Sequence, residues 1–98
     1  MATAHAQNWS VKLLVEGRDD FTVSAEKDGT HVAGSPCRGT AAAALEAVMR
    51  WLEDAGADPQ FEVLVQRAGG AIATLITPRR NVALYFIATT LERSEHAD

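Results

Sequence analysis

The 98-residue sequence contains a single cysteine, Cys37, and therefore no pair that could form a disulfide within the chain. A lone thiol in a small domain is typical of proteins in a reducing compartment. The first eight residues lack a basic segment followed by a long apolar run, which excludes an ordinary secretory signal. The longest apolar stretches, near residues 82–88, fall far short of the roughly 20 residues that a membrane-spanning helix needs. We therefore expect a cytoplasmic protein that does not bind a membrane.

Basic residues are also scarce. Nine Lys and Arg stand against 13 Asp and Glu, which gives a formal net charge of −4. Direct binding of nucleic acid draws most of its affinity from Lys and Arg side chains that neutralise phosphates. We therefore do not expect this chain to bind nucleic acid directly. An acidic surface suits a basic protein partner better, for example one that itself handles nucleic acid.

The remaining composition is that of an ordinary globular domain, with 47% apolar and 22% charged residues. A chain of this length fits a single domain, here residues 1–98. We expect residues 1–8 and 92–98 to form a flexible leader and a flexible tail.

Alternation of apolar and polar residues predicts strands in five places. The Asp28-Gly29 pair between two of these runs is typical of a hairpin turn, since glycine readily adopts the positive φ that such turns require. The predicted strands are Trp9–Val15, Phe21–Glu26, His31–Ala33, Phe61–Gln66 and Ala71–Thr77.

Between the third and fourth of these strands the apolar spacing changes to three and four residues, which predicts a helix over Thr40–Ala55. Thr40 is a suitable N-cap, and Glu46 and Arg50 form a favourable i,i+4 pair. Gly56 suits the position just after the last helical residue, where the backbone often takes the left-handed conformation that glycine readily adopts. The residues on the apolar face are Ala41, Ala44, Leu45, Val48, Leu52 and Ala55.

The segment Val82–Thr90 is compatible with a strand or a helix. Pro78 would suit the first turn of a helix, but Arg79 and Arg80 would then lie at the positive end of the helix dipole. The β-branched and aromatic residues of the segment favour a strand, and we therefore expect a strand there. The sequence thus predicts an α+β fold of the order β-β-β-α-β-β-β, with an antiparallel sheet of five to six strands and one helix packed on one face.

No group of residues has the spacing of a catalytic or metal-binding motif. None of His5, His31 and His96 pairs with another His or with Cys37 at the spacing of metal ligands, so we expect no zinc site. Cys37 has no base at a recognisable spacing that could activate it as a nucleophile. We expect no enzymatic activity and no cofactor. A protein that binds another macromolecule is then the favoured class.

Charged turns and one tryptophan are the candidate contacts for such a partner. Adjacent carboxylates or arginines in a turn are more often simply solvated, and a tryptophan placed as Trp51 is, beside Met49, more often extends the apolar face of the helix. Tryptophan is nevertheless enriched in the residues that dominate binding energy at interfaces. The candidate partner-binding residues are Asp19, Asp20, Asp28, Trp51, Arg79 and Arg80.

The stretch from Asp20 to Pro78 resembles a small phage-encoded type I-F anti-CRISPR protein. The resemblance is carried by Phe21-Thr22-Val23, Glu26-Lys27-Asp28-Gly29, Val32, Gly34, Gly39, Ala41–Ala44, Ala47, Met49, Trp51, Phe61-Glu62-Val63-Leu64 and Ile76-Thr77-Pro78. It implies an inhibitor, in the cytoplasm of a host bacterium, that binds a type I CRISPR–Cas surveillance complex or its nuclease. Such a protein would block target DNA binding or nuclease recruitment, as a monomer or a dimer.

The first strands and the helix that starts at Gly39-Thr40 also resemble the partly degraded double-stranded-RNA-binding fold of HicB-type antitoxins. This second resemblance implies a protein that masks a toxin ribonuclease. The DNA-binding module of that family has no counterpart here, since the residues that could supply it are predicted to form one strand.

Overall fold

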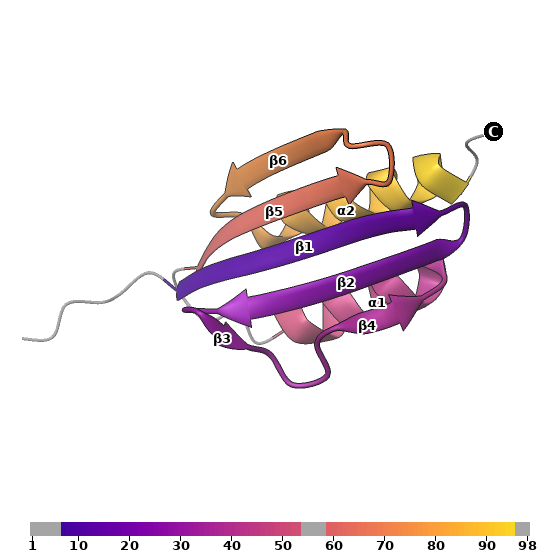
Figure 1. The fold of residues 1–98 in the computed structure, drawn as a ribbon. Coiled ribbons are helices and arrows are strands. Elements are labelled where there is room, and N and C mark those ends of the chain that lie inside the picture. The colour runs from indigo at the N-terminus through magenta and orange to yellow at the C-terminus, as the bar shows by residue number, and fades with distance from the viewer. Residues whose placement is uncertain (1–6, 54–58, 96–98) are drawn as a thin grey trace, which may run out of the picture.

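The computed structural model describes residues 7–53 and 59–95, which form an α+β fold (Figure 1). Six strands and two helices lie in these two ranges. The strands are β1 (Gln7–Gly17), β2 (Asp20–Lys27), β3 (Thr30–His31), β4 (Cys37–Gly39), β5 (Pro59–Arg67) and β6 (Ile72–Thr77). The helices are α1 (Ala41–Leu52) and α2 (Arg80–Glu95). The predicted fold class is thus confirmed.

The sheet is mixed, not antiparallel throughout. Its strand order is β3-β2-β1-β5-β6, and β4 pairs with β2 beside β3. The pairs β1–β2 and β5–β6 are antiparallel, whereas β1 and β5 run parallel in the register Val11 to Val63. The parallel pair arises because α1 carries the chain back across one face of the sheet, so that β5 starts at the same end as β1. The expectation of a fully antiparallel sheet was wrong at this one pair.

The five predicted strands all occur. The Asp28-Gly29 turn has φ angles of 52° and 85°, which confirms the turn that this pair predicts. β3 is shorter than expected and ends at His31, and β4 falls in a segment where no strand was expected. Residues 7–8 of the predicted leader belong to β1, and residues 92–95 of the predicted tail belong to α2. The rest of both segments lies outside the described residues.

Helix α1 begins where the sequence predicts. Thr40 is the N-cap, and its side-chain oxygen accepts a hydrogen bond from the backbone N–H of Ala43 at 3.3 Å. The predicted pair of Glu46 and Arg50 is present, with an N···O distance of 3.2 Å. The helix ends at Leu52, earlier than the predicted end at Ala55; both Ala55 and Gly56 lie outside the described residues.

The segment Val82–Thr90 is helical, and the prediction of a strand there was wrong. It forms the middle of α2, whose buried apolar residues Ala83, Ile87 and Leu91 recur every four positions on one side. A helix is about 10 Å wide and neighbouring strands lie about 4.8 Å apart, so one helix covers only about two strands. α1 lies over β2 and β4, and α2 lies over β5 and β6. The second helix is needed to cover the remaining half of the sheet.

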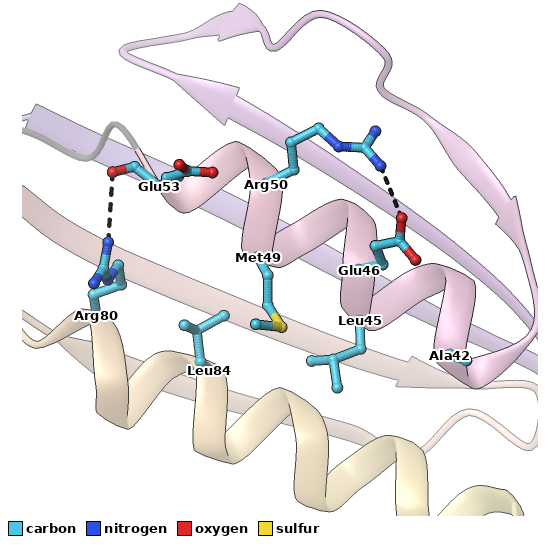
Figure 2. Close-up of a pocket in the computed structure, with 8 residues that line it drawn as sticks. All are labelled: Ala42, Leu45, Glu46, Met49, Arg50, Glu53, Arg80 and Leu84. Atoms are coloured by element: carbon cyan, nitrogen blue, oxygen red, sulfur yellow. Dashed lines mark hydrogen bonds and ion pairs between the residues drawn. The ribbon is translucent and has the colours of Figure 1, made fainter.

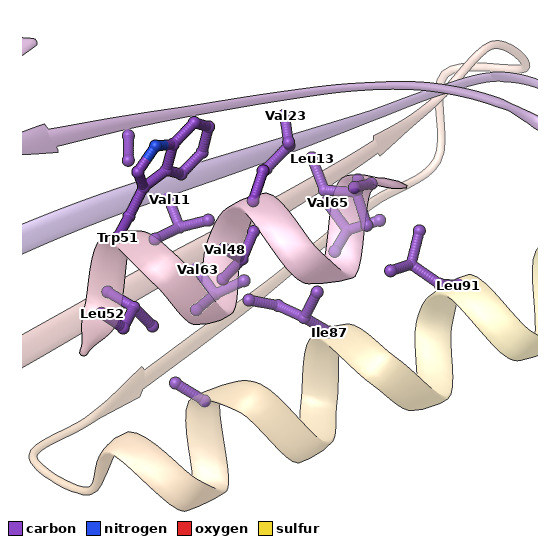
Figure 3. Packing of buried hydrophobic residues seen from close by; sticks show 14 of the residues in the cluster. Val11, Leu13, Val23, Val48, Trp51, Leu52, Val63, Val65, Ile87 and Leu91 are labelled. Carbon is purple, nitrogen blue, oxygen red and sulfur yellow. The ribbon is translucent and has the colours of Figure 1, made fainter. Parts of the chain in front are cut away.

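Both helices lie on the same face of the sheet, and the core fills the space between them and the strands (Figures 1 and 3). The alternate residues of β1, β2 and β5 point into this core, as their alternation predicts. The core residues are Trp9, Val11, Leu13, Val15, Phe21, Val23, Ala25, Ala41, Ala44, Ala47, Val48, Trp51, Leu52, Phe61, Val63, Val65, Ala83, Ile87 and Leu91.

No helix in the described ranges covers the opposite face of the sheet, which we call the open face (Figure 1). Its residues are Ser10, Lys12, Leu14, Thr22, Ser24, Glu26, Glu62, Leu64, Gln66, Ile72, Thr74 and Ile76, as the strand registers place them. Most of these side chains are polar, which is usual for a sheet face in contact with water.

Candidate functional site

The two helices run antiparallel, and an open groove of about 610 Å³ lies between their outer sides (Figure 2). We call it the helix groove. The first residue of α2, Arg80, lies close to the end of α1, so the helices meet at one end of the groove. The residues that line the helix groove are Ala42, Leu45, Glu46, Met49, Arg50, Glu53, Arg80 and Leu84.

The middle of the helix groove is apolar. Leu45 and Met49 come from α1 and Leu84 comes from α2, and Figure 2 shows the three side chains pointing toward one another. Met49 is 53% exposed, although neighbouring core residues of α1 are almost completely buried. A large flexible thioether side chain in contact with water is typical of surfaces that adapt to a partner. The exposed Met49 thus makes this groove the strongest candidate contact surface.

Charged groups border the apolar middle. On one side, Arg50 pairs with Glu46. At the end where the helices meet, Arg80 Nη1 donates to the carbonyl oxygens of Leu52 and Glu53, both at 3.5 Å. These carbonyls belong to the end of α1, where the last carbonyls of a helix have no partner within it. Arg80 therefore links the start of α2 to the end of α1. The exposed side chains of Glu46 and Arg50 remain on the other side, where they can make polar contacts with a partner.

Such a groove can accept one or two apolar side chains of a partner and surround them with charged hydrogen-bonding groups. This arrangement of an apolar centre and a polar rim is the usual anatomy of a protein–protein contact.

Trp51 does not present an exposed surface. It is only 7% exposed, and it packs in the core against the sheet (Figure 3). Its position therefore matches the interpretation of Trp51 as an extension of the apolar helix face.

Asp19 and Asp20, in and just after the turn between β1 and β2, both have partners within the chain. Asp19 Oδ1 accepts a hydrogen bond from the backbone N–H of Ala41 at 3.1 Å, so it caps the start of α1 together with Thr40. Asp20 forms two hydrogen bonds with Arg38, at 2.9 and 2.7 Å. These hydrogen bonds, helped by the nearby positive charge, lower the pKa of Asp20 below its ordinary value. The hydrogen bonds to Asp20, together with its negative charge, in turn raise the pKa of Arg38.

The other candidate residues lie at the opposite end of the sheet. Asp28 lies in the turn after β2, and its Oδ1 accepts a hydrogen bond from the backbone N–H of Asn8 at 2.9 Å. Arg79 is exposed and follows β6, whose last residue pairs with Phe61 near the start of β5. The candidate residues therefore do not gather at one site, and of the six only Arg80 lines the helix groove.

Sequence reasoning missed Leu45, Met49 and Leu84 as a group, because two of them lie on a helix whose partner helix was predicted to be a strand. The one available signal was Met49 itself, an apolar residue beside the main apolar face of the predicted helix.

The part of the chain that the structure describes has no helix long and apolar enough to cross a membrane. Comparison of the chain with models of protein families, with curated proteins and with solved structures gives no match.

Proposed function

We propose that this protein is an inhibitor that binds a type I CRISPR–Cas surveillance complex, or the nuclease that the complex recruits, through the helix groove. It acts by occupying a surface of a Cas subunit, which blocks target DNA binding or nuclease recruitment. The observation that carries the proposal is the half-exposed Met49 in the apolar middle of a groove with a charged rim.

The choice of partner is supported by the resemblance of residues 20–78 to a type I-F anti-CRISPR protein. Ala42 and Met49 are among the residues that carry this resemblance, and both line the helix groove. The resemblance and the geometry therefore favour the same surface of α1.

The charge of the chain also supports such a partner. A net charge of −4 favours approach to the basic surfaces with which nucleic-acid-binding proteins hold their substrates. The charge speeds the encounter, whereas the apolar groove supplies most of the affinity once the surfaces meet.

The decisive experiment measures binding of the purified chain to an immobilised type I-F surveillance complex and, separately, to its nuclease. We expect one of the two to bind. Met49→Glu would place a carboxylate in the apolar middle of the groove, next to Leu45 and Leu84, and should weaken binding at least about tenfold, which corresponds to about 1.4 kcal/mol. Its melting temperature should stay close to that of the wild type, because the side chain at position 49 is half exposed.

The matched control is Tyr85→Glu. Tyr85 is another large, exposed side chain on a helix, 74% exposed, but it does not line the helix groove. This variant should bind as the wild type does. If neither Cas component binds the wild-type chain, the anti-CRISPR function is wrong; if one binds and both variants bind it equally well, the helix groove is not the contact surface.

A further inference from the structure

Strand β6 forms one edge of the sheet, and that edge is unpaired in the described residues. β6 is last in the strand order, and it lies against β5 on one side and α2 on one face. An unpaired edge offers a row of backbone N–H and C=O groups to any other strand.

The hydrogen bonds of the hairpin show which residues carry these free groups. The backbone N–H of Arg67 donates to the carbonyl of Ala71 at 2.9 Å, so this pair is bonded across the hairpin. In an antiparallel pair, bonded positions alternate with non-bonded ones. Ala73 and Leu75, opposite Val65 and Val63, therefore bond to β5. The backbone groups of Ile72, Thr74 and Ile76 point away from β5, toward the free edge.

This edge lacks the usual protection against pairing. Natural edge strands are kept apart by charged residues, proline, bulges or short length. β6 is six residues long and contains no charge and no proline, and its Ile72 and Ile76 are 63% and 60% exposed. The opposite edge differs, since it consists of the short strands β3 and β4, the latter with the exposed Arg38.

We propose that β6 pairs with β6 of a second copy of this chain, in antiparallel orientation, to form a symmetric dimer with one continuous sheet. The two-fold axis passes at Thr74, which lies opposite Thr74 of the partner subunit. Ile72 then lies opposite Ile76 of the partner subunit, and Ile76 opposite the partner's Ile72. The three pairs use the outward-pointing backbone groups and can form about six hydrogen bonds, two for each bonded pair.

The sequence of β6 favours a second copy over a foreign strand. A two-fold interface requires each position to be complementary to its symmetry mate. Around Thr74 the residues read Ile, Ala, Thr, Leu, Ile, so that isoleucines at both ends face each other and small or apolar residues lie between them. Apolar β-branched pairs and threonine pairs are among the cross-strand pairs that stabilise a sheet. A two-fold axis perpendicular to the sheet also keeps all helices of the dimer on one face.

The size of the interface sets the expected strength. Standard specific interfaces bury at least about 1,200 Å² in total, and we expect a contact through one strand and its side chains to bury less than this. We therefore expect a dimer that dissociates in the micromolar range. Because each copy carries a net charge of −4, and β6 itself is uncharged, added salt should strengthen the dimer by screening the repulsion between copies.

Sedimentation equilibrium of the purified wild-type chain at increasing concentration tests the proposal. The informative variant is Thr74→Pro. It removes an N–H that points to the free edge and no bond of the β5–β6 ladder, a position at which proline is tolerated in an edge strand. We expect a folded monomer with the far-UV circular dichroism of the wild type. Thr74→Val, which keeps the N–H, is the matched control and should still form a dimer.

A second pair of variants tests the register and does not depend on proline. The double variant Ile72→Lys with Ile76→Lys should be monomeric, and so should Ile72→Glu with Ile76→Glu, because like charges then face each other across the two-fold axis. A mixture of the two should form a heterodimer, in which each introduced ammonium group lies opposite an introduced carboxylate.

Amide hydrogen exchange gives a third readout. Protection of the amides of Ile72, Thr74 and Ile76 should rise with protein concentration, whereas those of Ala73 and Leu75 should be protected at every concentration. A wild-type chain that stays monomeric at the highest concentration overturns the proposal. So does a dimer that both double variants retain. Because the measurement is of self-association, either result is independent of whether the chain binds a Cas protein.

Discussion

Truncation of Ile87 tests the feature of the fold that the sequence predicted wrongly. Ile87 is completely buried and points from α2 toward the core (Figure 3). Ile87→Ala removes about three buried carbon atoms, and at about 0.8 kcal/mol for each the transfer term alone is about 2.4 kcal/mol. The cavity left behind adds to this loss, and comparable truncations cost about 2–5 kcal/mol. We expect the free energy of unfolding to fall by about 3 kcal/mol.

The comparison variant is Tyr85→Ala, two residues away. On a strand, residues 85 and 87 would share a face and would be buried or exposed together. On α2 they lie on different sides, and Tyr85 is 74% exposed. Its truncation should therefore change the free energy of unfolding by no more than about 0.5 kcal/mol.

The measurement is urea unfolding followed by far-UV circular dichroism. The midpoint should drop for Ile87→Ala with an unchanged slope, which would mean that only stability has changed. In a thermal melt the same loss should lower the midpoint by roughly 12 °C or more, since about 1 kcal/mol corresponds to about 4–8 °C in a domain of this size. Equal losses for the two variants, or a larger loss for Tyr85→Ala, would contradict the helical assignment of α2 and the packing argued from it.

Two further predictions concern the turn between β1 and β2. Asp19→Ala should lower the free energy of unfolding by about 1 kcal/mol in chemical denaturation, because it removes the side-chain acceptor of the Ala41 amide at the start of α1. Asp20 has a lowered pKa in the folded chain, so its contribution to stability is present above its ordinary value of 3.8 and is lost as the pH falls through the lower folded pKa. Asp20→Asn should therefore flatten the loss of stability below about pH 4, as thermal melts over a pH series would show; a slope like that of the wild type would mean that the pair with Arg38 does not form in solution.

The strands and α1 were predictable because their local pattern and their tertiary role agree. β1, β2 and β5 bury every second residue, from Trp9 to Val15 for example, so the alternation in the sequence is the alternation of the core. α1 buries residues at spacings of three and four, and Thr40 caps it. In these segments a single face is buried, and the periodicity that marks this face is visible without the structure.

α2 could not be assigned in this way, because its composition and its position conflict. Its β-branched and aromatic residues, such as Val82, Tyr85 and Phe86, favour a strand when taken alone. Its residue types also do not divide cleanly into an apolar and a polar helix face, since Val82 and Tyr85 are exposed while Thr90 is buried. Tertiary packing decides the outcome: a sheet of this width needs a second helix over β5 and β6, and this segment is the only one in the described ranges that follows the last strand.

The candidate site was less predictable than the fold for the same reason. The helix groove exists only where two helices lie side by side, so its apolar middle cannot be inferred while one of them is taken for a strand. Of the five charged residues chosen from the sequence, Asp19, Asp28 and Arg79 lie outside strands and helices, whereas Asp20 begins β2 and Arg80 begins α2. Four of the five are used within the fold: Asp19 and Asp28 accept hydrogen bonds from backbone N–H groups, Asp20 pairs with Arg38, and Arg80 joins α1 to α2. Charge in a turn indicates exposure, and it does not indicate whether a local backbone group already uses that charge.

We propose different roles in binding for the helix groove and for the free edge of β6. The groove lies between the outer sides of α1 and α2, whereas β6 lies at the far edge of the sheet. In the proposed dimer both grooves open on the same side of one continuous sheet. For a partner that presents its site more than once, the second contact becomes intramolecular and the overall affinity rises without any new contact. Thr74→Pro should then weaken binding only to a partner with repeated sites, whereas Met49→Glu should weaken binding to every partner, and this difference separates the role of assembly from that of recognition.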